Sequence, residues 1–217
     1  MNLKRQLFAM CTAAMLCGPV FANNDVVYSY AGAVDSDDTN RGWVSFTGQF
    51  AFNKTSTDQI PDSVTADYKI AGWPYGMNVV FKDAGNHVTD FSLNDSFDIL
   101  VANNLPGLGN SDQFGTLARN AALTDSLGFT LADLTQTAFA SDALPLQAGG
   151  LTLGMFDWSQ FRYESGAGTV IGHLTSLSCV SGCDGAVPAP VPEPQTYALM
   201  LAGLGVVGFV GRRRREV

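Results

Sequence analysis

The stretch Trp43-Val-Ser-Phe-Thr-Gly-Gln-Phe-Ala-Phe52 alternates between apolar and polar side chains. One face would carry Val44, Phe46, Phe50 and Phe52, and the other face would carry Ser45, Thr47 and Gln49. Successive side chains of a β-strand point to opposite faces, so a period of two indicates a strand with one buried face. We therefore expect a half-buried strand, with Val44 and the three phenylalanines in the core.

Similar apolar runs continue along residues 23–184, with Gly, Asn and Asp separating them about every 8 to 12 residues. The further strand candidates are 26–34, 64–72, 77–82, 87–93, 97–102, 115–124, 151–157, 159–164 and 169–178. Residues 83–86 and 165–168 have the composition of hairpin turns, and residues 131–139 favour a short helix or a turn. The pattern predicts an all-β domain, an antiparallel β-sandwich of jelly-roll type.

The chain has 217 residues and a net charge of −8, and 46% of its residues are hydrophobic. Residues 23–184 contain 6 basic and 18 acidic side chains, so this part alone has a charge of −12. Such a surface repels phosphates, which excludes nucleic acid as a partner.

Residues 1–22 have the features of a secretory signal peptide. Lys4 and Arg5 supply the positive start, residues 7–16 form a short apolar run, and small side chains precede a cleavage site between Ala22 and Asn23. The apolar run is much shorter than the roughly 20 residues that a membrane span needs. We expect an exported protein.

The other end combines three features in order. A proline-rich spacer, 185–191, precedes Pro192-Glu193-Pro194, and an uncharged stretch over 196–211 then leads to Arg212, Arg213, Arg214 and Arg215. The apolar stretch predicts a membrane helix, with its arginines on the cytoplasmic side. This arrangement over 192–217 closely resembles the PEP-CTERM sorting signal of bacteria.

The resemblance implies a transient inner-membrane stage. In that family an exosortase recognises the Pro-Glu-Pro motif and removes or exchanges the tail, so that the protein reaches the cell surface or the extracellular matrix. The family's association with exopolysaccharide implies a role in the matrix and an extracellular polysaccharide as partner.

Two cysteines remain after removal of the signal peptide, Cys179 and Cys183. A pair in an exported protein predicts a disulfide, and Gly182 would help the chain to turn between the two cysteines. A zinc site would need two more ligands, which only His173 and an aspartate could supply.

The loop with Asp35, Asp37, Asp38 and Asn40 is rich in oxygen ligands. Calcium prefers such ligands, so a calcium site is one interpretation of this loop. The other interpretation is a solvated turn, in which Asp and Asn favour a bent backbone. We expect no other cofactor.

No catalytic motif is present, so we expect a protein without enzymatic activity. There is no G-x-S-x-G or H-E-x-x-H sequence, and the two histidines, His87 and His173, lie within strand patterns. Glycoside hydrolysis needs two facing carboxylates, for which Asp157 and Glu164 are the best candidates. A polysaccharide-modifying enzyme is therefore the alternative hypothesis.

Exposed aromatic rings offer another route to glycan contact, because flat rings stack on sugar faces. Trp73 and Tyr75 flank a proline in a turn, and Trp158 begins a strand. The competing interpretation is core packing, which takes up most large aromatic side chains. The sequence thus favours a non-catalytic structural module or a polysaccharide-associated module.

Overall fold

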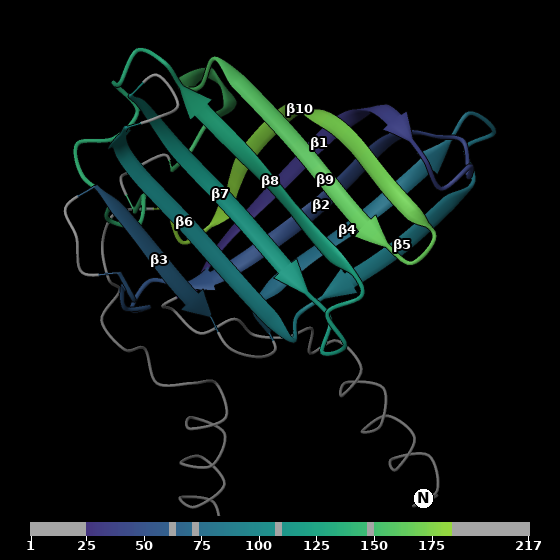
Figure 1. Cartoon of the computed structure of the whole chain (residues 1–217), viewed down its shortest axis with the longest axis horizontal. Coiled ribbons are helices and arrows are strands. Elements are labelled where there is room, and N and C mark those ends of the chain that lie inside the picture. Colours follow the sequence, from purple (N-terminus) through teal and green to yellow (C-terminus); the bar gives the residue numbers. More distant parts are fainter. Residues whose placement is uncertain (1–24, 61–63, 71–73, 107–109, 147–149, 184–217) are drawn as a thin grey trace, which may run out of the picture. The chain divides into compact units, whose positions relative to one another are not determined.

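The computed structural model describes residues 25–60, 64–70, 74–106, 110–146 and 150–183, which form ten antiparallel strands (Figure 1). The strands are β1 (Asp25–Asp37), β2 (Trp43–Asn53), β3 (Thr65–Ile70), β4 (Gly76–Asp83), β5 (Val88–Leu93), β6 (Ser96–Leu105), β7 (Ser111–Arg119), β8 (Ser126–Asp133), β9 (Trp158–Ser165) and β10 (Gly168–Ser181). A short 3-10 helix, η2 (Leu153–Met155), precedes β9.

All ten strands belong to one hydrogen-bonded sheet, in the order β3-β6-β7-β8-β9-β10-β1-β2-β4-β5. In Figure 1, β3 and β6 to β9 lie in front of the strands from β10 to β5. The sheet therefore curls so that its two halves face each other. The all-β antiparallel prediction is confirmed, whereas the two-sheet jelly roll is not, because the hydrogen bonds run through a single sheet.

The curl occurs at β10. Its first two residues pair with β9, residues 170–172 pair with both β9 and β1, and the later residues pair with β1 alone. At this point the ring of Phe46 lies over Gly172, where a Cβ atom would be only 2.8 Å from the ring and 2.3 Å from a carbonyl oxygen of β1. Glycine thus permits the close approach of two strands and a ring.

The core between the two halves is largely aromatic. Tyr30 of β1 packs 5.5 Å from Phe129 of β8, centroid to centroid, and Phe50 of β2 packs 5.5 Å from the same ring. The Tyr30 hydroxyl group donates a 2.6 Å hydrogen bond to the Asn78 carbonyl oxygen, and complete burial raises its pKa. Aromatic contacts of this kind stabilise the packing of the two halves, in addition to the free energy gained by burying apolar surface.

The strand over residues 43–52 is confirmed, but the prediction that Val44 lies in the core is wrong. Phe46, Phe50 and Phe52 are buried as expected, whereas Val44 is 48% exposed and Trp43 is buried instead. The pairing of β2 with β4 shifts between Trp43 and Ser45, as a β-bulge does. The extra residue reverses the alternation at the start of the strand.

Three other segments differ from expectation. Strand β8 begins at Ser126 and includes the start of the stretch 131–139, which then continues as turns. Strand β7 begins earlier and ends earlier than 115–124. Residues 151–157 contain η2 instead of a strand. Both expected hairpin turns are confirmed, because β4 pairs with β5 and β9 pairs with β10.

Candidate functional site

A groove of about 590 Å³ crosses the outward face of β6, β7, β8 and β9. On these strands the inward side chains, such as Ile99, Phe129 and Phe161, are buried in the core. The residues between them face solvent, because side chains alternate along a strand. The sequence therefore places an apolar face inside and a mixed face in the groove, where charged and polar side chains lie beside Ile60, Leu100 and Leu117.

Two glycines form the middle of the groove. Gly115 of β7 lies opposite Thr130 of β8, and Gly128 of β8 lies opposite Leu117 of β7. A Cβ atom on Gly128 would lie only 2.1 Å from the Thr116 carbonyl oxygen. Larger residues are thereby excluded from this position, because the backbone of β7 occupies the space where a side chain would stand. Both glycines are buried within the sheet.

Two arginine–carboxylate pairs flank the glycines. On one side, Arg119 Nη1 donates a 3.2 Å hydrogen bond to Asp98 Oδ2, which joins β7 to β6. On the other side, Arg162 Nε donates a 2.8 Å hydrogen bond to Glu164 Oε1 on β9. The groove thus presents donors and acceptors of both charges on fixed strands.

The carboxylates of the groove differ in their electrostatic surroundings. Partial burial and the charge of neighbouring Asp98 raise the pKa of Asp67, which lies on β3 near Lys69. By contrast, the hydrogen bonds from Arg162 lower the pKa of Glu164 and outweigh the opposing effect of burial. Ser126 Oγ also donates to Glu164, over 3.2 Å, so Glu164 is a fixed anion that links β8 to β9.

Trp158 lies on the same outward face as the groove. It lies two positions before Gln160 and four before Arg162, so the three side chains are on one face of β9. Gln160 and Arg162 line the groove, and Trp158 is 47% exposed. Tyr75 differs, because its hydroxyl group donates to Asp25 Oδ1 over 2.7 Å and accepts from Asn53 over 3.0 Å. Trp73 lies outside the described residues. Of the predicted aromatic contacts, Tyr75 lines a separate depression of about 180 Å³, and Trp158 lies on the outward face of β9 beyond the residues that line the groove.

Hydrogen bonds hold the end of β1 and the loop that follows it. Asp37 Oδ1 accepts from the backbone N–H of Thr39 over 2.9 Å, Asp37 Oδ2 accepts from the N–H of Trp43 over 3.1 Å, and Asp35 contacts His173 Nδ1 over 2.9 Å. Burial opposes the charge of Asp37, but these hydrogen bonds prevail and lower its pKa. Within the described parts of the chain, no three His, Cys, Asp or Glu side chains form a group that could hold a metal ion. Calcium binding by Asp35, Asp37, Asp38 and Asn40 stays a prediction.

Asp157 and Glu164 do not face each other. Asp157 immediately precedes β9 and Glu164 lies near its other end, so at about 3.3 Å per residue they are roughly 23 Å apart. Asp157 Oδ2 accepts from the N–H of Leu134, and Glu164 is bound to Arg162. Paired glycosidase carboxylates are about 5 to 10 Å apart, so this pair does not have the geometry of such a site.

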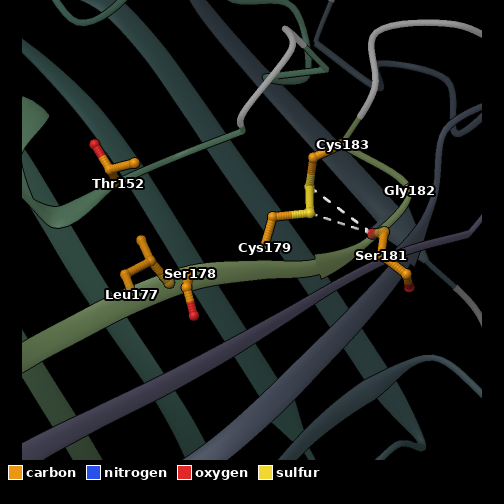
Figure 2. Close-up of a pocket in the computed structure, with 7 residues that line it drawn as sticks. All are labelled: Thr152, Leu177, Ser178, Cys179, Ser181, Gly182 and Cys183. Atoms are coloured by element: carbon orange, nitrogen blue, oxygen red, sulfur yellow. Dashed lines mark hydrogen bonds between the residues drawn. A yellow bond between two sulfur atoms is a disulfide. The ribbon is translucent and has the colours of Figure 1, made fainter.

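Cys179 and Cys183 are joined by a disulfide, with their Cα atoms 6.2 Å apart. It lies beside Ser181 at the end of β10 and borders a depression of about 410 Å³ (Figure 2). Gly182 has a φ of +81°, in the left-handed region that favours glycine, and it supplies the turn that the sequence predicted. None of the described residues that line this depression has an ionisable side chain, so they offer no group for acid–base chemistry.

The sequence prediction missed the groove residues Arg119, Arg162, Gly115 and Gly128. A signal was present, because a glycine inside a strand pattern often marks a close approach of another chain or a ligand. That signal becomes specific only when strand pairing places Gly115 and Gly128 on neighbouring strands.

The described domain belongs to the class of all-β antiparallel proteins and carries a groove with polar and apolar lining residues on one outward face. The remaining identification comes from the end of the chain, where residues 190–215 match the family model of the PEP-CTERM protein-sorting motif. This motif marks an exported protein that is targeted to an exosortase, with processing at the membrane and the cell surface as its destination. No curated protein and no solved structure matches the chain.

The match covers Pro192, Glu193 and Pro194 and all four terminal arginines, as the sequence predicted. The signal peptide, the spacer 185–191 and the expected helix 196–211 lie outside the described residues. Among the residues that are described, no helix is long and apolar enough to cross a membrane.

Proposed function

We propose that the chain is a surface or extracellular-matrix protein whose domain associates with polysaccharide without modifying it. The sorting motif supports delivery to the outside of the cell. The observation that carries the proposal is the groove on the outward face of β6 to β9, which is open to a ligand and rich in hydrogen-bonding groups. Binding sites of this kind combine a concave surface with a few placed polar groups.

The route to the surface follows from the motif. The tail with Pro192, Glu193 and Pro194 holds the exported chain at the inner membrane until an exosortase acts on it. The domain then leaves with its net negative charge, which keeps it soluble and away from anionic lipid.

A polysaccharide-modifying enzyme is the alternative function. The separation of Asp157 from Glu164 along β9 gives it no support, and the carboxylate of Glu164 is occupied by Arg162 and Ser126. A hydrolase or lyase would shorten the polymer, whereas an associated module would leave its length unchanged.

The test is co-sedimentation of the exported protein, purified from the extracellular fraction, with the exopolysaccharide of the producing cells. We expect the protein to pellet with the polymer, and the size distribution of the polymer to stay constant on incubation. Shortening of the polymer would favour the enzyme, and failure to pellet would contradict the proposal. Parallel samples with EDTA and with EDTA followed by excess calcium test the loop at Asp35, since a calcium-dependent contact is lost in the first and restored in the second.

A further inference from the structure

We propose that the groove binds a neutral, hydroxyl-rich polysaccharide chain, which lies along the outward face of β9 between Trp158 and Glu164. This inference rests on the proposed function and specifies its site and its ligand class. It uses three observations: the shape of the groove, the balance of its charges and the position of an exposed tryptophan.

The shape of the groove suits an extended chain. The outward residues of β9 from Trp158 to Glu164 span roughly 20 Å, since a strand rises about 3.3 Å per residue. Of these residues, Gln160, Arg162 and Glu164 line the groove, and Trp158 lies beyond its lining on the same face. A ligand of several sugar rings can therefore contact β9 along its length.

The charges of the groove oppose a strongly charged ligand. Among the described residues, its ionisable lining groups are two guanidiniums, each in an ion pair, and three carboxylates, of which Asp67 lies 3.8 Å from Lys69. An anionic polymer would meet all three carboxylates, and a cationic polymer would meet both guanidiniums. Either one would have to break an existing ion pair to gain a partner.

Hydroxyl groups match the same lining without that cost. A sugar hydroxyl both donates and accepts, so neighbouring hydroxyls can accept from Arg162 while they donate to Glu164. Hydrogen bonds to charged groups are stronger than those between neutral groups, which makes an intact ion pair an effective partner for a diol. Gln160 and Thr130, which face each other across β8 and β9, add neutral donors and acceptors to the lining.

Trp158 supplies an apolar contact at one end. Its ring stays 47% exposed, although burying such a ring in the core would release more free energy. An exposed indole two residues from Gln160, on the same face of β9, is placed to stack on the apolar face of a sugar ring. The ring thus complements the hydrogen-bonding groups further along the strand.

The test separates the exopolysaccharide of the producing cells by anion exchange into a neutral and an acidic fraction. Binding of the exported protein to each fraction is measured by affinity electrophoresis at low and high ionic strength. We expect binding to the neutral fraction, with little dependence on salt, because screening acts on net charges.

Trp158→Ala and Arg162→Gln should each weaken that binding by about tenfold, which corresponds to roughly 1.4 kcal/mol of lost contact. Val88→Ala is the matched control, because Val88 is 64% exposed on β5, at the opposite edge of the sheet from β3. It should leave binding unchanged. Thermal unfolding of each variant shows whether the domain stays folded.

The outcomes distinguish a failure of the proposed site or ligand class from a failure of polysaccharide association as a whole. Binding to the acidic fraction alone would overturn the ligand class but leave polysaccharide association standing. Neutral binding that neither groove variant weakens would overturn the site. Absence of binding to both fractions would overturn this inference together with the proposed function.

Discussion

Phe46 of β2 and Phe161 of β9 stack with their ring centroids 3.8 Å apart and their planes inclined by 21°. The two strands belong to opposite halves of the curled sheet, separated in the strand order by β10 and β1. The contact therefore connects the groove-bearing strand to the strand whose sequence first indicated the fold. Both rings are almost fully buried.

Phe46→Ala should lower the free energy of unfolding by about 3 to 5 kcal/mol, since it removes a ring from a closely packed core. Val44→Ala, two residues away on the same strand, should change it by no more than about 0.5 kcal/mol, because Val44 is exposed at the bulge. Urea denaturation of both variants checks the difference. Equal losses would contradict the assignment of Val44 to the surface.

Asp133 should make the domain sensitive to acid. Its carboxylate accepts five hydrogen bonds from Thr135, Thr137 and Ala138. Burial opposes its charge, but these hydrogen bonds prevail and hold its pKa well below the ordinary value. Because the folded pKa is the lower one, the stabilisation is complete above the unfolded pKa of about 4 and is lost as the pH falls through the folded pKa.

Asp133→Asn should lower the free energy of unfolding at pH 7 by about 2 kcal/mol or more, because the amide group cannot accept all of these hydrogen bonds. The difference from the wild type should shrink as the pH is lowered below about 4. Denaturation curves at pH 7 and pH 3 measure it, with Asp90→Asn on the exposed face of β5 as control. A constant difference at both pH values would show that the charge of Asp133 is unimportant.

The disulfide should contribute less to the free energy of unfolding than the turn at Gly182, which it encloses. Replacing Cys179 and Cys183 together by alanine should cost about 2 kcal/mol at most, because the closed loop is short. Gly182→Ala should cost more, since its φ is positive and a Cβ atom would lie 2.1 Å from the Asp25 carbonyl oxygen. Thermal unfolding of both variants tests the order, and the reverse order would contradict this account.

The sorting motif predicts loss of the tail. Intact mass spectrometry of the extracellular protein should show a chain that lacks residues 196–217. Glu193→Gln should keep the full-length tail and accumulate in the membrane fraction, because the motif that the exosortase recognises is altered. An extracellular mass that still includes 196–217 would show that the tail is retained.

The strands β4, β5, β9 and β10 could be predicted because each pair is joined by a short turn of Gly, Asn, Asp or Ser between apolar runs. Residues 126–133 also alternate, with Leu127, Phe129 and Leu131 inward. No strand was expected there, and residues 131–139 favoured a short helix or a turn. Pairing with both β7 and β9 decides for a strand. Periodicity over a short run is ambiguous until neighbouring strands supply hydrogen bonds.

Residues 151–157 were predicted to form a strand, but they do not form one. The run is apolar enough for a strand, but its backbone N–H groups bond to other partners, with Leu151 donating to the Tyr28 hydroxyl oxygen and Asp157 donating to the Ala132 carbonyl oxygen. A strand requires a neighbour along its length, and no composition rule reveals whether one is available.

By itself, the sequence determined the all-β class and the sorting signal, because local alternation, turn residues and a linear motif are properties of contiguous residues. Only the tertiary structure decided the single curled sheet, the exposure of Val44 and the groove. The groove depends on Gly115, Gly128 and Arg162 meeting across three paired strands. Which residues lie opposite each other is set by the register of distant segments, and the order of residues along the chain does not encode that register locally.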